Sequence, residues 1–197
     1  MPGLADQPLA RLLDLVAAAD PAPGAGSSAA VSAALGAALL EMTARLGLAS
    51  ADRAPGIPGD APERAQGLRE RALELADRDM SSYAPVLDAM RLPPTDPARE
   101  QRLQAALAEA SRTPLEIAEL AAEAASLAAR VTAASKPAVR GDALAGVLFA
   151  EAATVAAASL VEINLADRDD PDLARARDAR RRAQEARTDA LATLARS

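Results

Sequence analysis

Cysteine and histidine are both absent from this chain of 197 residues. Without cysteine there is no disulfide framework and no thiol nucleophile. Without histidine there is no Ser-His or Cys-His pair and no histidine-containing zinc or di-iron site. Acid-base chemistry therefore falls to Asp, Glu, Arg, Tyr or Lys136, which is the single lysine. We expect no metal site.

Aromatic side chains are almost as rare, at 1% of the chain, and only Tyr83 and Phe149 are available for stacking. Hydrophobic residues nevertheless make up 50% of the chain, and most of them are alanine. Such a core is built by helices that approach closely across small side chains, and no segment has a strand pattern. We predict an all-α fold, an antiparallel up-and-down helical bundle that forms one domain over residues 1–197. Because alanine gives a small domain little bulky core, we also predict close helix pairing between subunits in a homodimer.

Positive charge is in deficit, with a formal net charge of −6 and a pI near 4.8. Binding to a phosphate backbone needs a basic face, so we expect no nucleic acid partner. The arginine-rich stretch 175–187 also contains Asp178 and Glu185, a mixture that is typical of a solvated helix face.

Long uninterrupted apolar runs and a basic leader are both lacking. The N-terminus carries Asp6 without a preceding basic residue, and the two most apolar stretches are interrupted by Glu41 and Glu151. Both stretches fall short of the roughly 20 clean apolar residues that a membrane span needs. We expect no membrane association and a cytoplasmic location.

Apolar residues at helical spacing organise the chain. They form two clear stripes, one of Leu9, Leu12, Leu13 and Val16 and one of Val31, Leu35, Leu39, Met42 and Leu46. Prolines and glycines predict loops over 50–62 and 134–142, and helices over 63–92, from 95 onward, over 143–165 and over 171–195. Thr113-Pro114 marks either a kink or a new helix start.

A proline-braced glycine loop over residues 20–26 opens directly into a helix of small residues. Gly24 and Gly26 allow the backbone to come close to a ligand, and Ser27 or Ser28 can cap the helix. The start of a helix presents unpaired N–H groups and a positive dipole end, which suit a carboxylate, a phosphate or an electron-rich heterocycle. The alternative is an ordinary Gly/Ser helix start in a packed bundle.

Asp79 lies where the stripe of the 63–92 helix calls for an apolar residue. A carboxylate on a buried face costs several kcal/mol unless it is paired, so Asp79 is a candidate acid or base. The alternative is a structural hydrogen bond to an arginine or a helix end. Tyr83, one turn further on, is either a ligand contact or an amphipathic core residue.

Three further polar residues each have a functional and a structural interpretation. Asp142 follows Gly141 and can cap the next helix, and the lone lysine Lys136 lies in the same predicted loop. Asn164, near the end of the 143–165 helix, is either a terminal cap or a ligand contact.

Taken in order, these segments resemble the cyclodeaminase/cyclohydrolase family, which includes bacterial methenyltetrahydrofolate cyclohydrolases and the C-terminal domain of formiminotransferase-cyclodeaminase. The resemblance runs from the first helix to about Leu173. The matching segments are the loop and helix over 21–42, Asp79 to Pro93, Thr113-Pro114-Leu115, Ser135-Lys136-Pro137 through Gly141-Asp142, and Leu160 to Leu165.

The chain departs from the family pattern at several polar positions. The middle glycine of the loop is Ala25, and the Thr-x-Gly-Lys that usually follows the small-residue helix is replaced by the segment 47–50. The usual Gly-Asn pair is Ser135-Lys136, and the first asparagine of the last motif is Leu160. The fold therefore carries over better than the activity.

The resemblance implies folate chemistry in a helical dimer, with a tetrahydrofolate derivative as substrate and no tightly bound cofactor. The methenyl bridge is hydrolysed to the 10-formyl form, or a formimino group is cyclised with loss of ammonia. It implies Asp79 or Asp142 as the base and Lys136 as a charge partner, in a pocket beside the 24–27 loop. The implied substrate-binding residues are Pro23, Gly24, Gly26, Ser27, Tyr83 and Asn164. The alternative is a diverged, non-catalytic member that binds another small molecule or serves as a dimeric scaffold.

Overall fold

The computed structural model describes residues 3–49, 56–166 and 168–195, and in these ranges every regular element is a helix. The elements are the short 3₁₀ helix η1 (Leu4–Asp6), α1 (Leu9–Ala17), α2 (Ala25–Ala49), α3 (Ala61–Ser82), α4 (Ala84–Met90), α5 (Arg99–Ala110), α6 (Arg112–Ala134), α7 (Pro137–Asn164) and α8 (Pro171–Ala195). The predicted all-α fold is confirmed.

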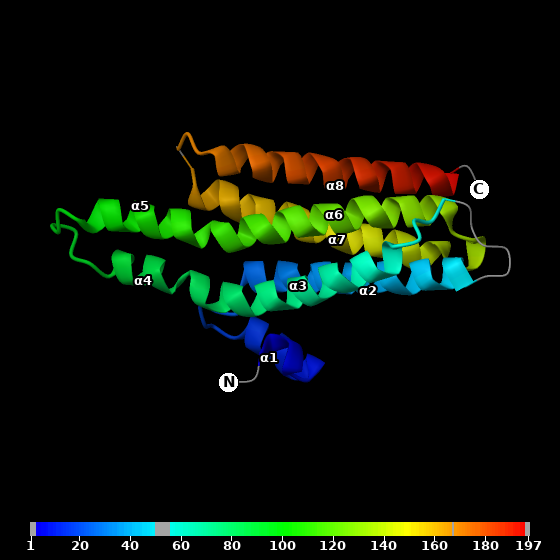
Figure 1. Cartoon of the computed structure of the whole chain (residues 1–197). Coiled ribbons are helices and arrows are strands. Elements are labelled where there is room, and N and C mark those ends of the chain that lie inside the picture. The colour runs from blue at the N-terminus through cyan, green and yellow to red at the C-terminus, as the bar shows by residue number, and fades with distance from the viewer. Residues whose placement is uncertain (1–2, 50–55, 167, 196–197) are drawn as a thin grey trace.

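The long helices form an up-and-down bundle (Figure 1). α2, α3 followed by α4, α5 followed by α6, α7, and α8 run in alternating directions along one axis. α4 and α5 extend beyond the other helices as a hairpin, and α1 lies to one side of the bundle. The homodimer stays a prediction.

The closest approach in the core is the crossing of α2 and α7. A Cβ built on Gly36 would lie 2.9 Å from the carbonyl oxygen of Gly146, and a Cβ built on Gly146 would lie 3.1 Å from the carbonyl oxygen of Gly36. The two backbones therefore touch at this level. The buried residues around the crossing are mostly alanine, as the composition predicts.

The predicted helix over 63–92 is broken into two, which corrects that expectation. α3 ends at Ser82, α4 begins at Ala84, and Tyr83 lies between them. Pro85 explains the break because proline lacks the N–H that would continue the hydrogen-bond ladder and its ring clashes with the preceding turn. Thr113-Pro114 follows a similar break at Ser111, which separates α5 from α6.

The predicted loop over 134–142 is also wrong, because α7 already begins at Pro137. Proline is well suited to the first position of a helix, and Gly141 is tolerated inside this one. Asp142 therefore lies within α7, with an exposed side chain, and does not cap a helix. The last helix, by contrast, spans Pro171–Ala195 as predicted.

The two apolar stripes of the N-terminal region are only partly covered: Leu12 and Val31 pack against the core, whereas most of the other large members are exposed. Leu9 is 71% exposed and Leu13 is 59% exposed on α1, and Leu35, Met42 and Leu46 are exposed on α2. An apolar stripe on a helix normally packs against a neighbour. The described part of the chain leaves these five side chains largely uncovered, so this part of the apolar face of α1 and α2 is open to solvent.

α2 and α7 are long and apolar enough to cross a membrane by length and composition. The expectation that Glu41 and Glu151 exclude a span was therefore too strong. Core helices pass the same test, and in this structure the two helices cross each other in the middle of the bundle. The finding is therefore weak evidence for a membrane span.

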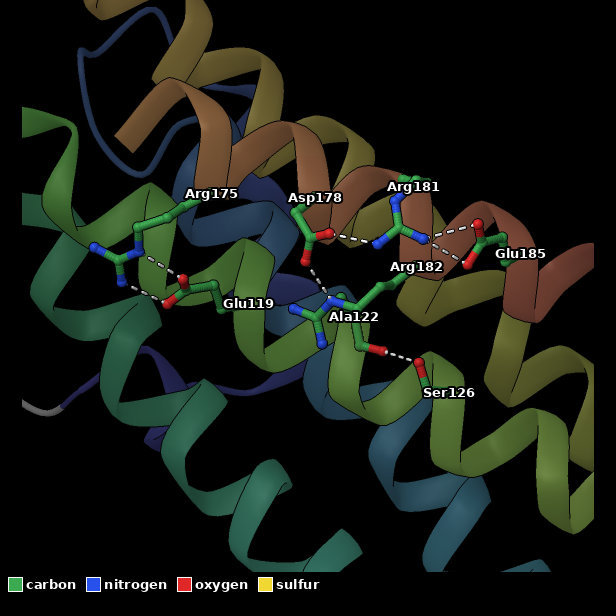
Figure 2. A network of polar contacts seen from close by, with 8 residues as sticks. All are labelled: Glu119, Ala122, Ser126, Arg175, Asp178, Arg181, Arg182 and Glu185. Carbon is green, nitrogen blue, oxygen red and sulfur yellow. Dashed lines mark hydrogen bonds and ion pairs between the residues drawn. The ribbon is translucent and has the colours of Figure 1, made fainter. Parts of the chain in front are cut away.

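The arginine-rich stretch of α8 forms surface ion pairs, as predicted for a solvated face (Figure 2). Arg181 bonds to both Asp178 and Glu185 along α8. Arg175 donates two hydrogen bonds of 2.9 Å to Glu119 on α6. The hydrogen bond from Arg181 lowers the pKa of Asp178 below its ordinary value. Exposed pairs of this kind each contribute little to stability.

Candidate functional site

A cavity of about 200 Å³ lies at the level of both helix breaks. Four parts of the chain line it: the start of α2, the α3–α4 junction, the α5–α6 junction and the end of α7. The structure brings together five of the residues singled out in the sequence, namely Gly24, Gly26, Asp79, Tyr83 and Asn164. The proline-induced breaks are what place Tyr83 and Pro114 beside the start of α2.

Asp79 is the centre of the polar contacts in this cavity. The Ser27 hydroxyl lies 2.9 Å from Oδ2 of Asp79 and 3.1 Å from the carbonyl oxygen of Ala76, so it can donate to either. Ser82 donates a hydrogen bond of 2.8 Å to the backbone carbonyl of Asp79. A Cβ on Gly26 would overlap the Asp79 carboxylate. Gly26 is therefore the residue type that lets the start of α2 approach this carboxylate.

Ser27 and Ser28 do not cap α2, which corrects that expectation. α2 begins at Ala25, so both serines lie in its first turn. The hydroxyl of Ser28 donates a hydrogen bond of 2.8 Å to the carbonyl oxygen of Gly24. Ser27 is buried, and its hydroxyl lies beside Asp79. The N–H groups of the first turn have no acceptor within the helix. The positive end of α2 thus lies beside the Asp79 carboxylate, where it favours negative charge.

The rest of the lining is mostly apolar. Met80, Leu87, Pro114 and Leu160 supply its larger side chains. Among the described residues that line the cavity, Asp79 is the only carboxylate, and none is lysine or arginine. A ligand with an apolar ring and an N–H donor or a positive charge fits this composition.

Tyr83 and Asn164 enter this lining from different elements, Tyr83 from the α3–α4 junction and Asn164 from the last position of α7. Tyr83 is 38% exposed, so it is not a core tyrosine. Pro23 is buried but lines a neighbouring groove between α1 and α2 instead of this cavity. The bond from Ala22 to Pro23 is cis.

The expected convergence of Lys136 and Asp142 with the 24–27 loop is wrong within one chain. Asn164, at the end of α7, lines the cavity, whereas Lys136 immediately precedes the start of this 28-residue helix. At 1.5 Å per residue the two ends of α7 are about 42 Å apart. Asp142 is about 33 Å from the cavity end by the same measure. The family motif had suggested proximity that the length of α7 forbids in a monomer.

An ion-pair cluster behind the cavity was missed from the sequence. Glu116 on α6 bridges Arg71 and Arg78 of α3, and Arg78 also donates a hydrogen bond of 3.2 Å to Thr113. Burial alone would raise the pKa of Glu116, but the hydrogen bonds from the two arginines lower it below its ordinary value. The cluster joins the end of α3 to the start of α6 next to Pro114. Periodicity within one helix could not reveal it, because its members come from two helices.

In the described ranges, no three His, Cys, Asp or Glu side chains are grouped so that they could hold a metal ion. Asp79 meets serine hydroxyls instead of further carboxylates. Its surroundings are therefore suited to binding a proton donor.

Known proteins with similar sequence and structure agree with this arrangement. Residues 8–183 match the sequence profile described as formiminotransferase-cyclodeaminase. The chain is 33% identical over 165 residues to a methenyltetrahydrofolate cyclohydrolase of Methylorubrum extorquens, covering 80% of this chain and 79% of that protein. Its fold matches a crystal structure of formiminotetrahydrofolate cyclodeaminase from Thermotoga maritima with a TM-score of 0.85, at 21% identity and over 97% of both chains. The chain belongs to the formiminotransferase-cyclodeaminase family.

Proposed function

We propose that this protein catalyses a one-carbon reaction on tetrahydrofolate, hydrolysing 5,10-methenyltetrahydrofolate to 10-formyltetrahydrofolate. The observation that supports this most is the Asp79 carboxylate, held by Ser27 in a cavity that is otherwise apolar. The curated relative with 33% identity bears the name of the cyclohydrolase, which favours this reaction over the cyclodeaminase reaction.

The charge of the cavity suits this substrate. The methenyl bridge is a positively charged amidinium, and Asp79 is the only carboxylate among the described lining residues. A carboxylate close to a delocalised cation stabilises it, and more strongly in a partly desolvated site. The apolar side chains of Met80, Leu87 and Leu160 would contact the flat ring system.

The proposed reaction needs one water and one base. Asp79 accepts a proton from the water while the oxygen of that water forms a bond to the methenyl carbon. The carbon–N5 bond then breaks as N5 takes the proton from Asp79, the remaining hydroxyl proton is released to solvent, and the carbon stays on N10 as a formyl group. General base catalysis of this kind contributes about 10²- to 10⁴-fold. The backbone of the 24–27 segment and the Tyr83 hydroxyl would orient the ligand.

The site is completed, in this proposal, by a second copy of the chain. A cavity of about 200 Å³ is smaller than the ~300–1,000 Å³ of pockets that enclose a drug-sized ligand. The exposed apolar face of α2 and the neighbouring Phe149 of α7 offer a surface for pairing. A two-fold axis perpendicular to the bundle, near the crossing of α2 and α7, would bring Lys136 and Asp142 of the partner subunit toward this cavity. The proximity that the family resemblance implies is then compatible with the length of α7, because the two parts of the site come from different subunits.

Two alternatives remain as outcomes of the test. The cyclodeaminase reaction would close formiminotetrahydrofolate to the methenyl form, with N10 attacking the formimino carbon and ammonia leaving. The non-catalytic scaffold is not favoured by the comparisons with known proteins. We propose a cytoplasmic location on the basis of the metabolic relatives.

Product analysis with both substrates tests the proposal. The purified protein is incubated with 5,10-methenyltetrahydrofolate or with formiminotetrahydrofolate, and methenyl absorbance and released ammonia are followed. We expect loss of methenyl absorbance beyond the spontaneous rate and no ammonia. Ammonia release from the formimino substrate would identify a cyclodeaminase instead. A rise in melting temperature with either ligand, without turnover, would identify a binding protein.

A further inference from the structure

The short helix α1 is amphipathic, but none of its residues is buried. Leu9 and Leu13 are largely exposed, and Val16 is 40% exposed on the same face. Isolated helices of nine residues are marginal in water, and exposed leucines add no stabilisation. Leu12 and Leu15 are partly buried against the core of the same chain, so α1 contacts its own subunit on one side and presents Leu9, Leu13 and Val16 on the other.

A groove of about 360 Å³ runs between α1 and α2. Leu13 and Val16 line it from α1, and Val31 and Leu35 line it from α2. Leu35 also belongs to the stripe of α2 whose Met42 and Leu46 are exposed further along the helix. α1 therefore extends the same open apolar face that the proposed dimer would cover.

The loop after α1 links this groove to the candidate site. Pro23 lines the groove, whereas Pro21, Ala22 and Gly24 line the cavity that contains Asp79. The segment before α1 is anchored, because the Leu4 N–H donates a hydrogen bond of 2.5 Å to the carboxylate of Asp77 on α3. α1 is therefore held at both ends and is open along its apolar face.

We infer that α1 is a docking arm for a second copy of this chain and that the docked arm sets the position of the Pro21–Gly24 loop at the ligand site. The inference rests on the proposed homodimer and adds the part of the interface that controls the site. With a two-fold axis near the middle of α2, the groove beside Val31 faces the partner's Met42 and Leu46.

The charges at the two ends of the bundle favour this occupant. At the α1 end of the open face Asp14 and Asp20 outnumber Arg11, whereas at the other end Arg45, Lys136 and Arg140 outnumber Asp142 and Glu41, which pairs with Arg45. A perpendicular two-fold axis places the acidic end of one copy against the more basic end of the other. A neutral lipid surface would not use this separation of charge.

The test compares the full-length wild type with Leu9→Gln/Leu13→Gln and with Ala10→Gln as a matched control. All three positions are exposed, so no core contact is lost. Self-association is measured by sedimentation velocity from nanomolar to micromolar concentration. Hydrogen exchange of residues 9–28 is followed over the same range, which requires no folate.

We expect the double variant to weaken self-association at least tenfold and to speed exchange in residues 18–28, while the control behaves as the wild type. A wild type that remains monomeric at micromolar concentration would overturn the inference, as would a double variant with unchanged association. Weakened association with unchanged exchange in residues 18–28 would refute the link to the loop. Binding of the wild type to phosphatidylcholine vesicles, lost in the double variant while association is unchanged, would assign α1 to a membrane instead. Failure of the wild type to bind folate would reject the proposed function alone.

Discussion

The Ser27 hydroxyl lies 2.9 Å from Oδ2 of Asp79, although the two residues are 52 positions apart in the sequence. The contact joins the first turn of α2 to the last turn of α3 beside the break at Tyr83. Because Gly26 leaves room for the same carboxylate, three residues define its position. The catalytic proposal depends on the charge of Asp79 and on this arrangement, which holds the carboxylate beside the start of α2.

Replacing Gly26 by alanine should move the Asp79 carboxylate, because the added Cβ would overlap it. We expect Gly26→Ala to lower methenyltetrahydrofolate turnover at least tenfold, about 1.4 kcal/mol of barrier. Gly67→Ala is the matched control, since Gly67 lies on α3 outside the cavity lining and an added Cβ there meets nothing within 4 Å. Steady-state kinetics of both variants, with circular dichroism to confirm folding, checks this. Equal activity of the two variants would contradict it.

Replacing a glycine by alanine should have opposite effects on stability at Gly36, where α2 crosses α7, and at Gly67 on α3. A Cβ on Gly36 lies 2.9 Å from a backbone oxygen of α7, so Gly36→Ala must push the two helices apart and should destabilise by about 1–3 kcal/mol. Gly67 on α3 has nothing within 4 Å of an added Cβ. Gly67→Ala should therefore stabilise by about 0.5–1 kcal/mol. Urea unfolding measures both, and a stable Gly36→Ala would mean that the helices cross less closely.

The pKa of Glu116 predicts an acid-dependent loss of stability. Its folded pKa is lowered by hydrogen bonds from Arg78 and Arg71, against the effect of burial, so folding is favoured by the ionised form. This stabilisation is fully present above the unfolded value of about 4.3 and is lost as the pH falls through the lower folded value. The side chain is 41% exposed, so the contribution should stay below about 1 kcal/mol.

Urea unfolding at pH 6 and pH 3 checks this expectation. Glu116→Gln should be less stable than the wild type at pH 6 and should approach it at pH 3. Glu70→Gln is the control, because Glu70 bonds to Gln66 instead of to an arginine. If Glu116→Gln lowers the free energy of unfolding by the same amount at both pH values, ionisation of Glu116 is not the cause.

A mixture of inactive chains tests whether Lys136 acts across subunits. Asp79→Asn and Lys136→Ala chains are expressed together, and both are inactive alone in the proposed dimer. A mixed dimer would keep one intact site, so we expect about a quarter of wild-type activity from random pairing. No recovery would place both residues in the same subunit's site. Full activity of Lys136→Ala alone would remove Lys136 from the reaction.

The helical class followed from composition and spacing, but helix boundaries did not follow as well. Alanine density and the lack of strand patterns predicted the bundle, and the register of Asp79 on an apolar stripe predicted its inward direction. Pro85 was overlooked as the cause of the break at Tyr83. Pro137 was taken for part of a loop, although proline at the first position starts a helix.

The sequence predicted only part of the candidate site. Local signals identified the glycine loop and Asp79, which the fold brings together. The order of family motifs suggested that Lys136 joins them, but order along a chain does not determine distance, and α7 separates Lys136 from the cavity. Ser82 escaped notice because its place in the lining depends on tertiary packing, and Leu160, noted in the sequence only as a departure from the family pattern, lines the cavity as well. Ser50, the last residue of the segment 47–50 that departs from the family pattern, lies outside the described residues.

Hydrolysis of 5,10-methenyltetrahydrofolate by the wild type and by Asp79→Asn tests the central claim most directly. The substitution keeps the shape of the side chain and removes its charge, and Asp88→Asn on the surface of α4 is the control. We expect wild-type and Asp88→Asn turnover well above the spontaneous rate and at least a tenfold loss in Asp79→Asn, with an unchanged melting temperature. Wild-type turnover by Asp79→Asn would contradict the assignment of Asp79 as the base.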